Sequence, residues 1–192
     1  MAKRRSLRHI QESGLYDLLE DYTFDKYKTP EPWQAAAKQK AQAYLTDHAG
    51  KWFVACGTVG SGKSHLCTAL CGAFLEAGKE VRYMRWRDDS TQIKAAVTDD
   101  YEYARLINPL KKADVLYIDD LFKGGQPTDA DKKLAFEIID YRYGKRSLPT
   151  IISGERTVNE LLAIDEAVGS RVVERCKGYC ITVTGNKNWR LK

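Results

Sequence analysis

The stretch Gly57-Thr58-Val59-Gly60-Ser61-Gly62-Lys63-Ser64 decides the fold of this chain. It matches G-x-x-x-x-G-K-[ST], the P-loop pattern that cradles nucleotide phosphates. The apolar run at 52–56 before it predicts a buried strand, and apolar residues at four-residue spacing at 66–74 predict a helix after it. The motif requires this strand–loop–helix context, which an ordinary glycine-rich turn rarely has. We therefore predict a nucleotide-binding site.

The residue types of the loop explain its chemistry. Glycines let backbone N–H groups turn towards a phosphate without a Cβ in the way, and the helix start adds unpaired donors. Lys63 is expected to contact the β- and γ-phosphates of ATP, and the Ser64 hydroxyl to hold Mg²⁺. The nucleotide-binding residues predicted in this region are Gly57, Thr58, Val59, Gly60, Ser61, Gly62, Lys63, Ser64 and His65.

Composition limits the class of protein. The chain has 192 residues, 43% hydrophobic and 30% charged, which suits one globular domain with a substantial core. The sequence has no apolar run long enough to cross a bilayer and no secretory signal, so we expect a cytoplasmic protein without a membrane partner. The five cysteines form no C-x-x-C pair, and we predict neither a zinc site nor a disulfide.

The N-terminal segment is basic within a net charge of +5. We predict that residues 1–12 form a flexible arm and that residues 13–192 form the domain. The arm either contacts nucleic acid or is a solvated tail. Charge by itself does not establish DNA binding.

Apolar runs alternate with helical patterns along the chain. Strands are expected at 52–56, 80–86 (at a sheet edge, because of its charge), 114–120, 149–153 and 179–184. Helices are expected near 13–20, 33–47, 63–77, 90–107 (ended by Pro109), 128–144, 157–164 and 165–176. This alternation predicts an α/β fold, an open parallel sheet with helices on both faces.

A second half of the site follows the strand at 114–120. An apolar strand ending in Asp119-Asp120 is a Walker B pattern, and the carboxyl ends of parallel strands meet at one edge. Asp119 is then expected to hold Mg²⁺ with Ser64, and Asp120 to polarise the water that attacks the γ-phosphate. Capping of a turn is the structural alternative for this pair of carboxylates.

Two further positions carry candidate catalytic groups. Ser153 ends the next strand at the same edge and is expected to sense the γ-phosphate or orient water, although such serines also serve local hydrogen bonding. Arg171 and Arg175 lie one helical turn apart and share a face. They are candidates for an arginine finger that acts on the γ-phosphate of a neighbouring subunit. Pairing with Glu174 or Glu166 on an exposed face explains their spacing equally well.

These motifs together resemble the AAA+ ATPases of the DnaC/DnaI helicase-loader type, whose fold the IstB transposition helpers share. The resemblance covers roughly residues 20–192. The Gly57–Ser64 loop resembles Walker A, residues 115–120 Walker B, residues 149–153 the sensor 1 strand, and residues 169–175 the arginine-finger helix, with Arg175 the better match. The connector with Tyr22 and Phe24 resembles the segment that packs beside adenine.

The resemblance implies a five-stranded sheet of order 5-1-4-3-2 and ATP hydrolysis. It also implies ATP-dependent self-assembly into a homo-oligomer, loading of a replicative DnaB-type helicase, and contact with single-stranded DNA. Three departures affect this expectation. Only the short arm precedes the ATPase domain, Glu155 stands where the family often has asparagine, and the chain ends soon after its last strand, without a helical lid. Arg190 resembles the family's terminal arginine and is a candidate substitute for the arginine of that lid.

Two other functions fit the P-loop. A transposition helper of the IstB kind would have nearly the same ATPase core, so the sequence separates it poorly from a loader. A small-molecule kinase would close an arginine-bearing lid over its acceptor to exclude water. Asp120 beside Asp119 suits the activation of water instead, and therefore favours an ATPase.

Overall fold

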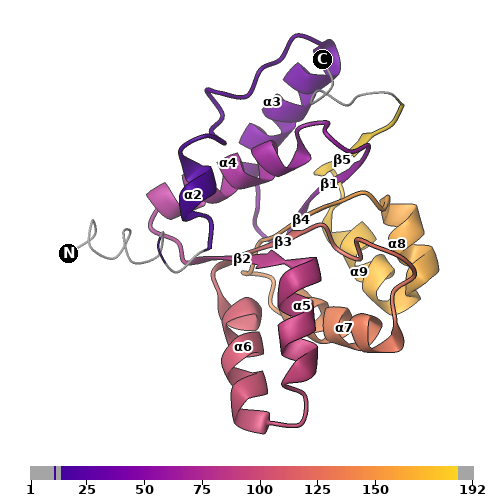
Figure 1. The fold of residues 1–192 in the computed structure, drawn as a ribbon. Helices are drawn as coiled ribbons and strands as arrows, with labels where there is room; N and C mark the ends of the chain where they lie inside the picture. The colour runs from indigo at the N-terminus through magenta and orange to yellow at the C-terminus, as the bar shows by residue number, and fades with distance from the viewer. Residues whose placement is uncertain (1–10, 12–13, 186–192) are drawn as a thin grey trace.

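A five-stranded parallel sheet lies between two layers of helices in the computed structural model, which describes residues 11 and 14–185 (Figure 1). Its strand order is β2-β3-β4-β1-β5, with every neighbouring pair parallel. This order is the predicted 5-1-4-3-2 read from the other edge, and it confirms the edge position of β2. The strands are β1 (Phe53–Gly57), β2 (Val81–Arg85), β3 (Val115–Asp119), β4 (Thr150–Gly154) and β5 (Cys180–Val183).

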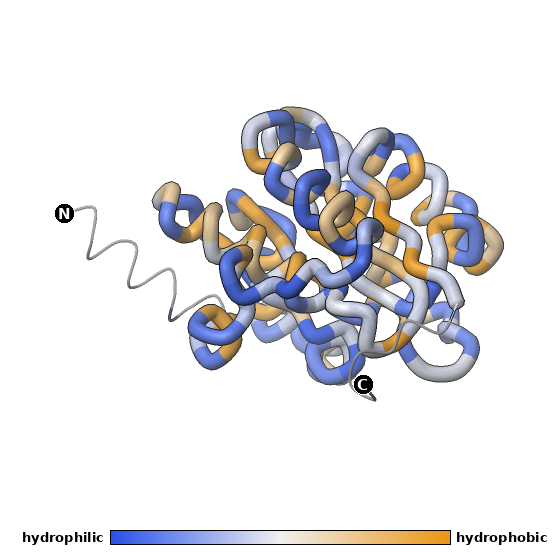
Figure 2. The backbone as a smooth tube through the Cα atoms, turned by 90° about the horizontal axis from the view of Figure 1, so that it is seen from above, coloured by the Kyte–Doolittle hydropathy of each residue, from blue (hydrophilic) through white to orange (hydrophobic). Residues whose placement is uncertain are grey.

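Helices cover both faces of the sheet, as the alternation of the sequence predicts (Figure 1). One layer holds α2 (Tyr16–Leu19), α3 (Pro32–Thr46) and α4 (Lys63–Glu76). The other holds α5 (Trp86–Ala95), α6 (Asp100–Lys112), α7 (Asp129–Tyr143), α8 (Val158–Ile164) and α9 (Glu166–Arg175). Hydrophobic and hydrophilic stretches alternate along the outer helices, because each helix turns only one side to the sheet (Figure 2).

Alternate residues of each strand enter two separate cores. On β1, Val54 and Cys56 pack in the cluster on the α5–α9 side, whereas Phe53 and Ala55 pack in the cluster on the α4 side. All four are at most 1% exposed. Burial on both faces explains why the β1 sequence is a continuous apolar run. Cys67 is fully buried on α4 and packs in the core, as its place in the helical pattern predicts.

Reciprocal capping boxes fix the starts of α7 and α8. Thr128 and Asp131 form a reciprocal capping box at α7, and Thr157 and Glu160 form another at α8. Thr128 and Thr157 lie at the predicted starts of these two helices. Helix α4 differs, because it begins after Gly62 without a side-chain cap, so its first N–H groups remain for another acceptor.

The prediction of one helix at 90–107 is wrong. Helix α5 begins earlier, at Trp86, and ends at Ala95, and α6 begins after Asp99, whose carboxylate accepts from the Glu102 amide at 3.0 Å. Pro109 lies inside α6, near its end. Pro109 lacks the N–H that would pair four residues back, and its ring crowds that carbonyl, but its own carbonyl still accepts from the Ala113 amide at 3.1 Å. The loss of one hydrogen bond therefore does not end the helix.

A buried arginine joins α6, α7 and the start of β4. Arg142 is 0% exposed, and its guanidinium donates to the Thr150 hydroxyl at 2.9 Å. It also donates to four backbone carbonyls, those of Leu110, Lys111, Ala113 and Pro149. These bonds satisfy a charge that would otherwise be costly to bury, and they fix where β4 enters the sheet.

Some predictions fall outside the described residues. Residues 1–10, 12–13 and 186–192 are not described, so nearly all of the basic arm and Arg190 lie beyond the structure. Within the described part of the chain, every helix is too short or too polar to cross a bilayer.

Candidate nucleotide-binding site

The P-loop joins the carboxyl end of β1 to the start of α4. Its three glycines have positive φ angles, 105° at Gly57, 70° at Gly60 and 86° at Gly62, a region that side chains disfavour. A Cβ on Gly57 would lie 2.0 Å from the Val183 carbonyl oxygen of β5. The Thr58 amide donates to the same oxygen at 2.9 Å. Glycine at position 57 therefore allows β5 to hold the loop closely.

A pocket of about 250 Å³ opens beside this loop. Its lining combines backbone of the loop, the uncapped start of α4, an aromatic side and charged side chains from the ends of β3 and β4. Such an uncapped helix start presents N–H donors and partial positive charge to an anion. The lining residues are Tyr22, Val59, Gly60, Ser61, Gly62, Lys63, Ser64, His65, Asp120, Lys123 and Glu155.

Lys63 lies folded onto the loop that precedes it. Its Nζ donates to the carbonyl oxygens of Gly57 at 3.0 Å and Thr58 at 2.7 Å. Burial lowers the pKa of Lys63, and the carboxylates of Asp120 and Glu155 act in the opposite direction. The ammonium therefore lies at the pocket with neutral oxygen partners, which a phosphate would replace with stronger ones.

Ser64 and Asp119 converge from two elements that lie far apart in the sequence. The Ser64 hydroxyl at the start of α4 donates to Asp119 Oδ1 at the end of β3 over 3.4 Å. A hydroxyl and a carboxylate are hard oxygen donors that suit Mg²⁺, which usually takes only one or two protein ligands beside phosphates and waters. No group of three or more His, Cys, Asp or Glu that could hold a metal occurs among residues 11 and 14–185. The Ser64 hydroxyl and the Asp119 carboxylate fit a Mg²⁺ ion that a nucleotide brings with it.

Three further hydroxyl groups hold Asp119. Tyr83 of β2 donates to Oδ2 at 2.8 Å, Tyr117 of β3 donates to Oδ1 at 2.9 Å, and Ser153 of β4 also donates to Oδ1. Ser153 is 1% exposed, and its hydroxyl oxygen lies 3.0 Å from that of Tyr117. Burial raises the pKa of Tyr83 and of Tyr117, so both remain neutral donors. Ser153 thus contacts the carboxylate of Asp119 and does not line the pocket.

Asp120 lies at the pocket in a backbone conformation that few residues adopt. Its φ is 57°, and so is that of Phe122, two residues later. Its carboxylate accepts from Lys123 Nζ at 2.7 Å, and the same ammonium lies 3.4 Å from Glu155. The hydrogen bond to Asp120 raises the pKa of Lys123. Asp120 lines the pocket, as predicted, and its carboxylate is paired with the Lys123 ammonium.

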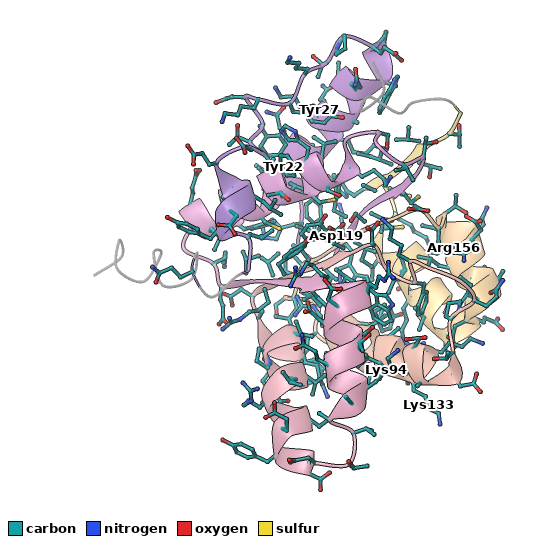
Figure 3. All side chains as sticks on the ribbon, viewed as in Figure 1. Tyr22, Tyr27, Lys94, Asp119, Lys133 and Arg156 are labelled. Atoms are coloured by element: carbon teal, nitrogen blue, oxygen red, sulfur yellow. The ribbon has the colours of Figure 1, made fainter. Side chains whose placement is uncertain are left out.

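The rings of Tyr22 and His65 form another side of the pocket, and Tyr27 packs behind His65. Tyr22 stacks on His65 with ring centroids 5.0 Å apart and planes 20° apart, and His65 Nε2 lies 2.7 Å from the Thr23 carbonyl oxygen. Tyr27 meets the edge of His65 at 5.1 Å and packs beside Gly62. Figure 3 shows Tyr22 and Tyr27 on the layer that holds α2, α3 and α4. Phe24 is partly buried against the core and does not line the pocket.

The two candidate finger arginines are held within their own chain. Arg171 pairs with Asp140 of α7 at 2.8 Å, and not with Glu174 or Glu166, the alternative that the spacing left open. Arg175 donates to the Gly50 carbonyl at 2.8 Å and to the Tyr143 carbonyl, and its guanidinium lies 4.7 Å from the Tyr143 ring centroid.

Arg175 lies at the start of β1, because its carbonyl accepts from the Trp52 amide at 2.8 Å. The P-loop follows the other end of this five-residue strand, roughly 16 Å away at 3.3 Å per residue. Within one chain, Arg175 is therefore remote from the pocket.

Several residues of the site escaped the sequence analysis. The two-residue spacing of Tyr117 and Asp119 already indicates a shared face of β3. Tyr83 was not predictable, because its place opposite Tyr117 depends on the register between β2 and β3. Lys123, three residues after Asp120, could have been recognised as a potential ion-pair partner.

The family to which the chain belongs follows from a sequence match over nearly its whole length. The family of IstB-like ATP binding proteins matches residues 2–192. This chain is a member of that family. The P-loop pocket and the Ser64–Asp119 pair agree with this family, because ATP is the nucleotide that the family name specifies.

Other proteins of known name are similar to this IstB-like chain. The phage-like element PBSX protein XkdC of Bacillus subtilis (strain 168) is 31% identical, with 96% of this chain and 73% of the relative covered. The replicative helicase loader DnaC of Escherichia coli (strain K12) is 28% identical, with 95% and 71% covered. The replication initiator DnaA bound to AMPPCP and single-stranded DNA has the same fold. It gives a TM-score of 0.71 at 20% identity over 88% of this chain and 51% of that one.

Proposed function

We propose that this chain is an ATPase of DNA replication that loads a replicative DnaB-type helicase onto single-stranded DNA. The convergence of Ser64 and Asp119 beside the P-loop pocket carries the ATPase part of the proposal. Similarity to the replicative helicase loader DnaC supports the cellular role. The similar fold of DnaA, whose structure holds AMPPCP and single-stranded DNA, supports the proposal that this chain binds ATP and single-stranded DNA.

Each residue of the site has a role in this proposal. The loop amides and Lys63 bind the phosphates, Ser64 and Asp119 hold Mg²⁺, and Tyr22 with His65 receives the base. Bound Mg²⁺ would neutralise phosphate charge. Asp120 orients a water whose oxygen bonds to the γ-phosphorus as the bond to the β–γ bridging oxygen breaks. The water proton passes to the Asp120 carboxylate, and the products are ADP and phosphate.

ATP binding is tested by calorimetric titration of Lys63→Ala. Loss of a charged hydrogen bond to phosphate should weaken ATP binding by about 10- to 100-fold. Lys133→Ala is the matched control, because Lys133 is an exposed lysine of α7 outside the P-loop pocket (Figure 3). Equal affinity of the two variants would refute the proposed phosphate site.

Hydrolysis is proposed to depend on an arginine from a neighbouring copy. Both arginines are bonded within their own chain. Arg171 pairs with Asp140, a carboxylate that is 46% exposed, and donates to the Ala167 carbonyl, whereas Arg175 donates to the Gly50 and Tyr143 carbonyls and has a buried Nε. We therefore expect Arg171 to be the group more easily released towards a partner. Mixing Arg171→Ala with Lys63→Ala subunits should restore part of the ATPase activity, because each variant supplies the half-site that the other lacks. Absence of rescue at every ratio would contradict an intersubunit site.

DNA and oligomer formation are tested on the same protein. Fluorescence anisotropy with a labelled single strand should show binding that ATP strengthens and salt weakens. Mass photometry should show larger assemblies with a non-hydrolysable ATP analogue than without nucleotide. Indifference to ATP in both assays would argue against an ATP-driven loader.

A transposition helper is the second candidate, because the matching family is that of the IstB-like proteins. A relative called a putative insertion sequence ATP-binding protein, from Sinorhizobium fredii, is 31% identical over 77% of this chain. A pull-down against the purified replicative helicase and a purified transposase separates the two roles. ATP-dependent capture of the helicase alone supports the loader, and capture of the transposase alone supports the helper.

A further inference from the structure

Lys123 forms a charged cluster with Asp120 and Glu155 at the pocket. Its ammonium lies 2.7 Å from the Asp120 carboxylate and 3.4 Å from that of Glu155. All three side chains line the same pocket as Lys63. Asp120 directly follows Asp119, the partner of Ser64, so the cluster lies at the end of the pocket that would receive the terminal phosphate.

The contacts of Lys123 can be exchanged. Its side chain is 42% exposed, and those of Asp120 and Glu155 are 33% and 43% exposed. Ion pairs this exposed are worth little in water, whereas a doubly charged phosphate is a stronger acceptor. An ammonium has three donors, so Lys123 could bind a phosphate oxygen and keep one carboxylate partner.

The surrounding backbone fixes where Lys123 begins. The Lys123 amide donates to the Asp120 carbonyl at 2.9 Å, and the Leu121 amide donates to the Ser153 carbonyl at 3.1 Å. Phe122, between them, is buried against the Trp86 ring, with centroids 5.2 Å apart. This short turn holds the Lys123 Cα beside the pocket and leaves only its side chain to move.

We propose that Lys123 binds the γ-phosphate of ATP and so makes the site discriminate ATP from ADP. Without a γ-phosphate, Lys123 neutralises Asp120 and Glu155. With ATP bound, its ammonium turns to the terminal phosphate, and Asp120 is released to accept a hydrogen bond from the attacking water. The inference rests on the proposed nucleotide binding and adds a residue that neither the P-loop pattern nor the Walker B pattern includes.

Calorimetric titration of Lys123→Met with ATP and with ADP tests this role. We expect ATP affinity to fall about tenfold, the factor for a lost charged contact, and ADP affinity to change less than about twofold. Lys123→Arg should recover most of the ATP affinity, because it keeps the charge. Lys133→Met is the control for loss of a surface lysine and should change neither affinity.

The outcomes separate this inference from the proposed function. Wild-type protein that binds neither nucleotide would overturn both. Wild-type binding with equal losses for ATP and ADP in Lys123→Met would overturn only the role of Lys123, since its effect would then be structural.

Glu155→Gln provides a second, independent readout. Removing one carboxylate that competes for Lys123 should tighten ATP binding, and this gain should shrink when Lys123→Met is present. A gain of the same size in both backgrounds would mean that Glu155 acts by repulsion alone, and would contradict the exchange of partners.

Discussion

Gly57→Ala should destabilise the domain much more than the same change at Gly78. Both glycines have positive φ angles, 105° and 78°, so alanine strains the backbone at both by about 1–2 kcal/mol. At Gly78 the added Cβ meets nothing within 4 Å. At Gly57 it would lie 2.0 Å from the Val183 carbonyl oxygen, so β5 must move away, at a further cost of about 1–3 kcal/mol.

Urea denaturation followed by tryptophan fluorescence measures this difference. An extra loss of about 2 kcal/mol, with a slope of about 2 kcal/mol per M, lowers the midpoint of Gly57→Ala by about 1 M relative to Gly78→Ala. ATP binding should fall only in Gly57→Ala, because Thr58 loses its bond to the displaced strand. Coincident midpoints for the two variants would refute the reasoning that close contact with β5 positions the P-loop.

Three other changes test the packing and the site. Arg142→Met should lower the free energy of unfolding by about 3 kcal/mol, because it leaves several buried carbonyls without a donor, and urea denaturation checks this. Burial would raise the pKa of Asp131, but hydrogen bonds from Lys94 and Thr128 outweigh the effect of burial and lower that pKa below 3.8. The ionised Asp131 carboxylate therefore stabilises the fold fully above pH 3.8, and this stabilisation is lost as the pH falls through the lowered pKa. Asp131→Asn should therefore destabilise the protein by about 1–2 kcal/mol at pH 7, and by progressively less as the pH falls below about 4. Asp129→Asn, which changes a carboxylate that is 93% exposed, should have little effect on stability at either pH. Parallel pH profiles of stability for the two variants would contradict this. Tyr83→Phe should raise the Mg²⁺ concentration that ATP hydrolysis requires several-fold, with little loss of metal-free ATP affinity, since the Tyr83 hydroxyl donates to the carboxylate that is proposed to hold the metal. An unchanged magnesium titration would exclude this positioning role.

The fold was predictable because the P-loop fixes one strand and one helix, and alternation of apolar runs with helical patterns supplies the others. The capping residues Thr128 and Thr157 were predictable for a local reason, because the side chain and the amide that it caps are three residues apart. The break between α5 and α6 was not predictable from the sequence, since an aspartate such as Asp99 can either begin a helix or lie on the exposed face of one.

The candidate site was only partly predictable. The loop and the Asp119-Asp120 pair follow from local pattern, whereas the Tyr83 contact depends on strand register. Arg142 has the sequence appearance of an exposed helical arginine, and only the three-dimensional arrangement of the surrounding carbonyls explains its burial. Arg175 illustrates the same difficulty, because the helical spacing of a charged side chain does not reveal that backbone carbonyls of distant segments bind it.

The most direct test of the proposed ATPase site is a crystal structure with a non-hydrolysable ATP analogue and Mn²⁺ in place of Mg²⁺. Anomalous scattering then locates the metal independently of the protein density. We expect the Mn²⁺ peak beside the β- and γ-phosphates, coordinated by the Ser64 hydroxyl and within reach, directly or through one water, of the Asp119 carboxylate. A metal peak away from both residues, or an analogue bound outside the P-loop pocket, would contradict the account.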